Sequence, residues 1–296
     1  MSRPAEIVDA QIHIGPGGIA EALAQMDALG IRAALIDEYW LFRGASNEPH
    51  HVLAGGVKRP VAPTAELAAQ LHPDRFSYLL RVDVADPDYA AIIRQLRDAP
   101  GGRALRVDPG MSAERRRMFA AGGYDHIFAA AADNGLPLFA FAPDDPAAFA
   151  RAAQAFPGLK LIIDHCGVFS NSMRSSFANL PPLGEPAQMA LFDQVLALAE
   201  YPNVALKWGH SSGMFDLPVW PGEGLWPIMR KTINAFGAER VMWASDFSVN
   251  QRGESWADLL YGVLGCPDLT PDERERVLGK ALRTWLDWPQ KTEKES

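Results

Sequence analysis

The sequence predicts an α/β fold, namely a (β/α)8 TIM barrel formed by one domain over residues 1–296. Two observations carry this prediction. Short apolar runs rich in Val, Ile and Leu alternate along the chain with longer stretches of helical periodicity. Several of these runs end in polar residues, such as His13, His165 and Asp246. Buried parallel strands are apolar along their length, and barrels of this kind carry their functional groups at the C-terminal ends of the strands.

Eight strands are expected, at about residues 6–13, 32–37, 77–82, 103–107, 136–141, 160–165, 203–208 and 240–245. Helices are expected between them, at 19–29, 87–98, 124–134, 145–155, 187–199, 225–236 and 255–264. A last helical segment begins after Thr270, which provides an N-cap, and Pro271 occupies the first helical position. Strict alternation of strand and helix gives a parallel sheet, and eight such units close it into a barrel.

Three connections are much longer than the others, at about residues 38–63, 166–186 and 209–224. They are rich in Gly, Pro, Ser and Asn, and each follows the C-terminal end of an expected strand. Loops of this length usually act as lids or binding loops, so we expect them to surround a site. Surface decoration without a function is the alternative.

The composition argues against several classes of protein. With 296 residues, 48% of them hydrophobic, the chain can bury a large core. A net charge of −8, a pI near 5.4 and the lack of a basic run argue against binding to nucleic acid or to an anionic membrane. Two cysteines, no leader-like N-terminus and no apolar stretch of membrane-spanning length lead us to expect a cytoplasmic protein whose partner is a small molecule. The sequence leaves open whether the protein forms a homo-oligomer.

Asp246 is the first candidate catalytic residue because it directly follows the eighth apolar run. A carboxylate at the mouth of a barrel can deprotonate water or bind a metal ion. The alternative is a helix N-cap, since both Asp246 and Ser248 are of residue types that cap well.

Two histidines are expected at the same mouth. Alternation along the first strand places Asp9, Gln11 and His13 on one face, where three polar groups would be costly unless they bind one another or a ligand. At the end of the sixth strand, neighbouring residues should face opposite ways. We therefore expect His165 to point inward and Asp164 to be structural.

Two cations at strand ends are candidate substrate anchors. Lys207 ends the seventh strand and Arg106 lies in the fourth, and both residue types bind carboxylates, arginine often through two hydrogen bonds. Salt bridges within the barrel wall, with Asp108 or Glu38, are the alternative.

Polar and aromatic residues beyond the second and seventh strands are expected to line a pocket for a ring-shaped ligand. These candidate substrate-binding residues are Glu38, Trp40, Trp208 and His210, and Gln11 of the first strand is a further candidate. Packing of the loops onto the barrel is the alternative for both tryptophans.

Three segments together resemble the amidohydrolase superfamily, specifically its amidohydrolase-2 branch. They are Asp9–His13, Asp164–Gly167 and Trp243–Asp246, and their order and spacing extend the resemblance over nearly the whole chain. The resemblance implies a barrel enzyme whose site uses His13, His165 and Asp246.

The chain departs from the metal-dependent members of that branch in two places. Gln11 stands where they have a histidine, and the fifth strand, at residues 136–142, contains no histidine or other metal ligand. A tight zinc site normally needs at least three protein ligands. The resemblance therefore favours the metal-independent lactonases, and we expect a hydrolase that opens a carboxylate-bearing lactone with water activated by Asp246 and with no metal cofactor.

Two alternatives remain. One is a metal-dependent decarboxylase of an aromatic or unsaturated acid, in which His13, Asp246 and His165 would hold a divalent ion such as zinc. The other is an inactive barrel that only binds a small acid, although three converging polar groups argue against a decayed site.

Overall fold

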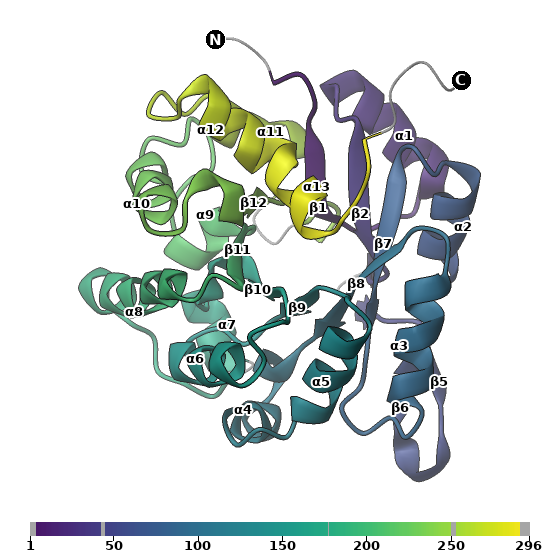
Figure 1. Cartoon of the computed structure of the whole chain (residues 1–296). Helices are drawn as coiled ribbons and strands as arrows, with labels where there is room; N and C mark the ends of the chain where they lie inside the picture. The colour runs from purple at the N-terminus through teal and green to yellow at the C-terminus, as the bar shows by residue number, and fades with distance from the viewer. Residues whose placement is uncertain (1–3, 43–44, 177, 250–252, 291–296) are drawn as a thin grey trace.

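The computed structural model describes residues 4–42, 45–176, 178–249 and 253–290, with the backbone alone for residues 40–42 and 45–47. One sheet of eight parallel strands has the order β1-β2-β7-β8-β9-β10-β11-β12, so each strand pairs with the next expected strand along the chain (Figure 1). Its strands are β1 (Val8–Ile12), β2 (Ala33–Asp37), β7 (Phe76–Arg81), β8 (Gly102–Val107), β9 (Leu138–Ala140), β10 (Leu161–Ile163), β11 (Val204–Trp208) and β12 (Val241–Trp243). All eight coincide with strands that the sequence predicted.

The sheet closes on itself beyond the end of β12. The backbone N–H of Asp246 donates to the carbonyl of Gln11 at 2.9 Å, and Ile12 pairs with Phe247 in a parallel bridge. The (β/α)8 barrel predicted from the sequence is thereby confirmed.

Helices connect the strands around the outside of the barrel (Figure 1). They are α1 (Gly18–Leu29), α2 (Pro63–Leu71), α3 (Tyr89–Asp98), α4 (Ala113–Ala120), α5 (Asp125–Asp133), α6 (Pro146–Ala155), α7 (Asn171–Ser176), α8 (Glu185–Ala197), α9 (Ser211–Phe215), α10 (Trp226–Phe236), α11 (Trp256–Leu264), α12 (Pro271–Glu275) and α13 (Ala281–Trp285). The expected N-cap at Thr270 is present: its hydroxyl accepts from the N–H of Glu273, whose carboxylate accepts from the N–H of Thr270.

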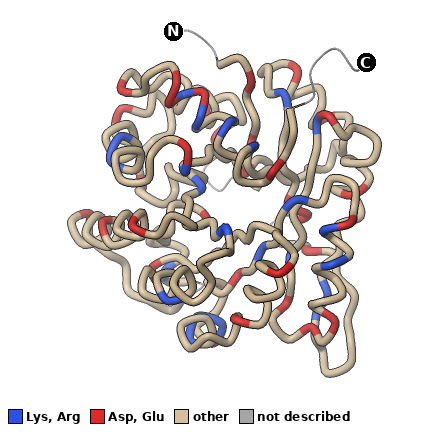
Figure 2. Tube along the Cα trace, viewed as in Figure 1, with Lys and Arg blue, Asp and Glu red and all other residues tan. Residues whose placement is uncertain are grey.

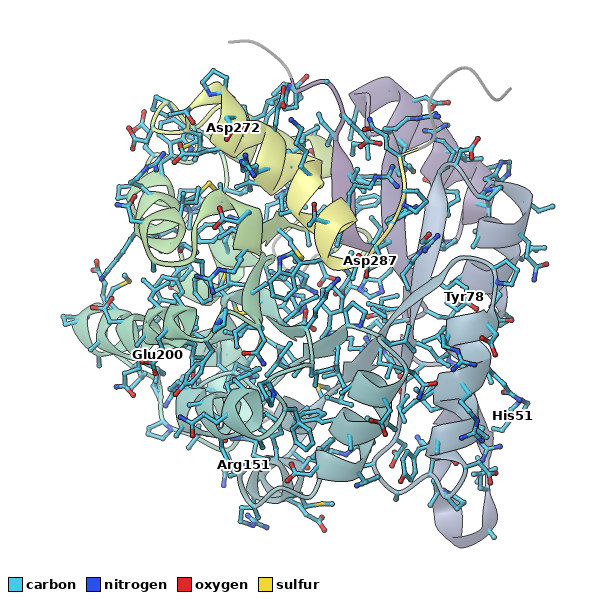
Figure 3. The ribbon with its side chains drawn as sticks, viewed as in Figure 1. His51, Tyr78, Arg151, Glu200, Asp272 and Asp287 are labelled. Carbon is cyan, nitrogen blue, oxygen red and sulfur yellow. The ribbon has the colours of Figure 1, made fainter. Side chains whose placement is uncertain are left out.

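The long connection after β2 contains two small antiparallel hairpins that the sequence did not predict. They consist of β3 (Trp40–Phe42) with β4 (Ala45–Asn47), and of β5 (His50–Val52) with β6 (Lys58–Pro60). Figure 3 shows His51 on the second hairpin, at the outer edge of the molecule. The other two long connections contain the short helices α7 and α9.

The apolar core has two parts. The larger lies between the barrel wall and the helices, while the smaller fills the barrel with side chains such as Val8, Ala10 and Phe139. Residues of α13 and the segment after it, including Trp285 and Trp288, belong to the inner cluster. The C-terminal helix therefore closes the barrel at the end opposite the strand C-termini.

One expectation about β1 is wrong. Asp9 does not share a face with Gln11 and His13, because Val8 and Ala10 point into the barrel and Asp9 points outward. Its carboxylate instead accepts a hydrogen bond of 2.9 Å from the indole N–H of Trp256 in α11. The pairing register with β2 shifts between Asp9 and Ile12, and such an irregularity breaks strict alternation.

Acidic and basic residues are interspersed along the trace, and neither sign gathers on one face in the view of Figure 2. Within the described ranges, no helix combines the length and apolarity that crossing a membrane requires.

Candidate active site

An open pocket of about 510 Å³ lies where the C-terminal ends of the strands meet. Its polar wall consists of Gln11, His13, Tyr39, Arg81, Arg106, Asp108, His165, His210 and Asp246. Phe141, Met111, Met173 and Val249 form the apolar part. The pocket therefore combines a charged floor with apolar surface, as expected of a small-molecule site.

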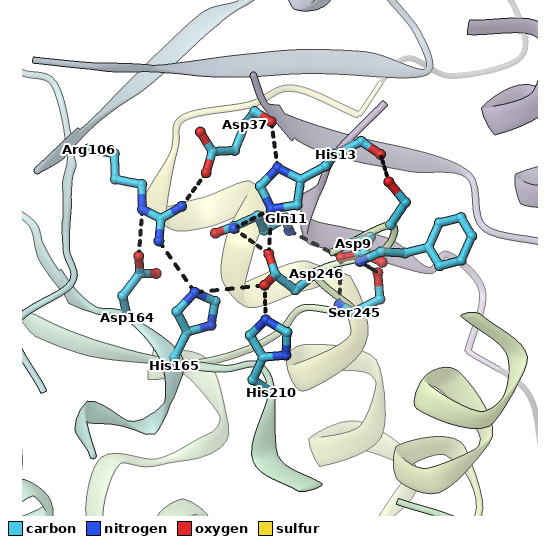
Figure 4. Close-up of polar contacts among 12 residues, drawn as sticks. Asp9, Gln11, His13, Asp37, Arg106, Asp164, His165, His210, Ser245 and Asp246 are labelled. Carbon is cyan, nitrogen blue, oxygen red and sulfur yellow. Dashed lines mark hydrogen bonds and ion pairs between the residues drawn. The ribbon is translucent and has the colours of Figure 1, made fainter. Parts of the chain in front are cut away.

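Asp246 is the centre of this site (Figure 4). One carboxylate oxygen, Oδ1, lies 2.8 Å from His13 Nε2 and accepts a hydrogen bond from the amide of Gln11. The other, Oδ2, pairs with His210 Nε2 and lies 4.0 Å from His165 Nε2. Burial by itself would raise the pKa of Asp246, but the surrounding histidines outweigh it and hold the pKa well below its usual range.

Both ring nitrogens of His13 have polar partners. Its Nδ1 lies 2.8 Å from the carbonyl oxygen of Asp37, which can only accept, so this nitrogen donates. Its Nε2 lies 2.8 Å from Asp246 Oδ1 and 3.2 Å from the amide nitrogen of Gln11. His13, Gln11 and Asp246 therefore form one hydrogen-bonded cluster.

Gln11 presents its amide nitrogen to the site because Lys207 holds its oxygen. The ammonium group of Lys207 donates to Gln11 Oε1, and this leaves Nε2 to face Asp246. Lys207 is fully buried and pairs with Asp164, which is fully buried as well. The structure thus places Lys207 beneath the pocket, in the wall salt bridge that was the alternative, rather than where a substrate would reach it.

Arg106 reaches the pocket, but its guanidinium group is already paired. Its Nε lies 2.8 Å from Asp164 Oδ2 and 3.2 Å from Asp108 Oδ1, and its Nη1 binds Asp37. Arg81 binds the same Asp37 at 2.6 Å and Asp108 at 2.9 Å. Burial would raise the pKa of Asp37, but the two arginines hold it well below its usual range.

The cations of the network below the pocket are therefore all paired with carboxylates. Three cations and three carboxylates alternate in it, namely Arg81, Arg106 and Lys207 with Asp37, Asp108 and Asp164. Glu48 adds a further negative charge 3.4 Å from Arg81. Within the described part of the chain, this network holds no unpaired cation for a substrate carboxylate.

His165 is neutral in this site. Burial, and then the charge of Lys207, lower its pKa well below its usual value. Its Nε2 lies 3.3 Å from Arg106 Nη2, and a guanidinium nitrogen can only donate. His165 therefore acts here as an acceptor that orients Arg106.

The expected opposition of Asp164 and His165 is wrong, because both side chains contact Arg106 inside the barrel. The strand ends at Ile163, and His165 adopts a left-handed backbone with φ 46°. Alternation of faces applies only within an extended strand, so it does not hold across this turn.

His210 lies at the centre of the site, where it contacts Asp246 directly, and the sequence did not indicate this contact. It follows β11, adopts a left-handed backbone with φ 52°, and its ring lies 4.9 Å from that of His165. We predicted a substrate-binding role from its position after the seventh strand, but nothing in the sequence showed that it would pair with Asp246.

Three of these groups converge closely enough to be tested as a metal site. Ligand atoms of His165, His210 and Asp246 all lie within 4.8 Å of one another. However, Arg106 donates to the same His165 nitrogen that faces the cluster, and Gln11 turns an N–H group rather than an oxygen to Asp246. In this arrangement Arg106 and Gln11 therefore compete with a metal ion for His165 and Asp246.

Other predicted residues lie at the edge of the site or outside it. Glu38 accepts a hydrogen bond of 2.7 Å from the N–H of Ala65 at the start of α2, and Trp208 is buried with its ring stacked on Phe215 at 6.0 Å. The side chain of Trp40 lies outside the described residues. Asp246 does not cap a helix, because the N-cap of α11 is Ser255.

Tyr39 and Asp37 complete the site next to His13 and Arg81. The ring of Tyr39 lies 5.5 Å from that of His13, and Arg81 lies over Tyr39 at 5.0 Å. The sequence analysis missed Asp37, although it is a carboxylate at the end of the second apolar run and so gave the same signal as Asp246.

A family model described as amidohydrolase matches residues 8–285 of the chain. Among curated proteins, L-fucono-1,5-lactonase from Burkholderia ambifaria is 28% identical over 136 residues, which cover 43% of this chain and 41% of that protein. The match thus spans less than half of the lactonase.

Solved structures of low sequence identity share the fold. An amidohydrolase from Burkholderia multivorans with bound HEPES has a TM-score of 0.74 at 16% identity, covering 96% of this chain and 100% of its own. The same enzyme has been solved with bound zinc, at a TM-score of 0.71. A probable 2-pyrone-4,6-dicarboxylic acid hydrolase from Acinetobacter baumannii has a TM-score of 0.67 at 11% identity, covering 96% of this chain and 100% of its own.

Proposed function

Because the chain belongs to the amidohydrolase family, we propose that it is a hydrolase that opens a lactone in the pocket around Asp246, without a metal ion. The observation that carries the proposal is the convergence of Gln11, His13 and His210 on one buried carboxylate. The partial similarity to a lactonase supports a cyclic ester as the substrate.

In this proposal Asp246 accepts the proton of the attacking water. The low pKa of Asp246 keeps the carboxylate ionised at neutral pH, so it is always available as an acceptor. The same low pKa makes the proton transfer late, since the water becomes acidic only as its oxygen bonds to the ester carbon. His210 and Gln11 hold the carboxylate in place during this step. Asp246 then returns the proton to the ring oxygen as the ester C–O bond breaks, which gives the open hydroxy acid and restores the carboxylate.

Positive charge must also stabilise the oxyanion that forms on the ester carbonyl. Arg106 supplies positive charge in the pocket wall, and His13 supplies a ring nitrogen 2.8 Å from Asp246 Oδ1. His165 does not donate to this oxygen through Nε2, because this nitrogen already accepts from Arg106. We therefore assign His165 the role of orienting Arg106. A lactone is reactive enough for such a site, because its ring is strained and its leaving group is an alkoxide. An amide is less reactive and needs a stronger Lewis acid.

The charges around the pocket indicate whether the substrate lactone carries a carboxylate group. A substrate carboxylate would meet Asp108 and Asp246, while Arg81 and Arg106 are already neutralised by the network. The sequence led us to expect a carboxylate-bearing lactone held by Arg106 and Lys207. The contacts of Arg106 and of Lys207 do not support such an anchor, because both side chains already pair with buried aspartates. We therefore propose a neutral, hydroxyl-bearing lactone as the preferred substrate.

The test is a matched pair of substrates assayed by proton release. A neutral sugar 1,5-lactone should be hydrolysed faster than 2-pyrone-4,6-dicarboxylate, with chelator present throughout. Asp246→Asn serves as the control for spontaneous opening. Turnover of neither lactone above that control, or turnover only after a divalent ion is added, would reject the proposal. Faster turnover of the dicarboxylate would restore the carboxylate-bearing substrate.

A further inference from the structure

A second polar pocket lies at the opposite end of the barrel from the active site. It has a volume of about 540 Å³ and lies beside the beginnings of strands β1, β2, β7 and β8. Its charged wall has three arginines and two carboxylates, namely Arg32, Arg103, Arg283, Glu6 and Asp74. The segment after α13 covers one side through Trp288 and Pro289, and Figure 3 marks Asp287 in that segment.

Arg283 is the arginine of this pocket that already has a carboxylate partner. Its Nη2 lies 2.6 Å from Glu6 Oε1, and its guanidinium group lies 4.3 Å from the ring centre of Trp288. Glu6 is thereby engaged by Arg283 and does not neutralise the other two arginines.

Arg103 lacks such a partner. Its Nε is buried and makes no hydrogen bond, and its Nη1 makes a single long one, 3.3 Å to the carbonyl oxygen of Asp287. The Asp287 carboxylate binds Lys160 instead, at 2.9 Å. A buried donor without an acceptor is costly, so this guanidinium group is left with unused capacity to bind an anion.

Arg32 adds a second positive charge to the same wall. Within the described ranges, its guanidinium group makes no ion pair with any carboxylate. Burial, and then the positive charge of Arg283, lower the pKa of Arg103.

We propose that this pocket binds a small oxyanion, a phosphate or carboxylate group, through Arg103 and Arg32. Guanidinium groups donate paired hydrogen bonds to the oxygens of both ligand types. A doubly charged phosphate gains more from two arginines than a carboxylate does, so phosphate should bind more tightly. The bound anion would join the starts of β2 and β8 to the segment after α13, which closes the barrel. This site does not depend on the reaction proposed above.

The experiment is a thermal melt of the full chain titrated with inorganic phosphate, with sodium chloride adjusted to keep the ionic strength constant. Binding to the folded state should raise Tm with the logarithm of phosphate concentration above Kd, by about 2–4 °C at ten times Kd. Acetate provides the carboxylate arm and should shift Tm less at equal concentration. The phosphate and acetate titrations both test the same pocket.

The variants decide whether the pocket is responsible. Arg103→Met should weaken phosphate binding by about 10-fold or more, and Arg32→Met should weaken it less. Arg103→Lys keeps the charge and should retain part of the shift, and it replaces Arg103→Met if that variant does not fold. Arg97→Met is the matched control, because Arg97 is an exposed arginine on α3 that pairs with Asp98. A phosphate shift that is absent from the wild type, or that is unchanged in the Arg103 variants, would overturn the proposal.

Discussion

Replacing Lys207 by Met should destabilise the protein strongly, because it leaves a buried carboxylate without its partner. The side chains of both Lys207 and Asp164 are 0% exposed. Breaking a buried ion pair on one side typically costs about 3–5 kcal/mol. For a chain of this size that corresponds to a fall in Tm of roughly 6–10 °C.

The assay is thermal or denaturant unfolding of Lys207→Met beside Lys160→Met. Lys160 also pairs with an aspartate, Asp287, but the two side chains are 39% and 76% exposed, so its loss should cost at most about 1 kcal/mol. A double variant that also carries Asp164→Asn should be less destabilised than the sum of the single changes, by about 0.5–3 kcal/mol. Equal stability losses in the two lysine variants would refute the view that Lys207 is a structural cation rather than a substrate anchor.

Three further predictions concern the catalytic carboxylate, the metal and the buried Asp9. Asp246→Asn should lower kcat for a lactone by about 10²–10⁴-fold while its thermal melt stays cooperative; near-normal turnover would reject Asp246 as the base. The purified protein should contain far less than one zinc or manganese ion per chain by elemental analysis and should keep its activity in chelator; stoichiometric metal together with loss of activity would favour the decarboxylase. Burial raises the pKa of Asp9 from its ordinary value of 3.8 to about 6, so the folded state binds this proton more tightly than the unfolded state. Its contribution to stability is therefore full below pH 3.8 and is lost as the pH rises through 6, a change of about 3 kcal/mol. Asp9→Asn should remove that part of the pH dependence, as measured by unfolding at pH 4 and pH 7, and an unchanged pH profile would contradict the assignment.

The sequence determined the barrel because its signals are local and repeated. Each of the eight predicted strands lies where a run of apolar residues indicated it, since a strand buried on both faces needs apolar side chains throughout. The helix start at Thr270 was equally local, because the cap consists of residues only three positions apart. The candidates His13, His165 and Asp246 followed from their positions at strand ends, where the parallel strands of a barrel meet.

The tertiary structure alone decided how these residues are used. A register shift within β1 separates the face of Asp9 from that of Gln11 and His13. A left-handed turn after β10 brings both Asp164 and His165 inward. Whether a cation is free to bind a substrate depends on neighbours that are distant in the sequence. Lys207 pairs with Asp164 and donates to Gln11, and Arg106 pairs with Asp37. A residue pattern can place a charge at the mouth of a barrel, but only the closed barrel shows whether another buried charge already neutralises it.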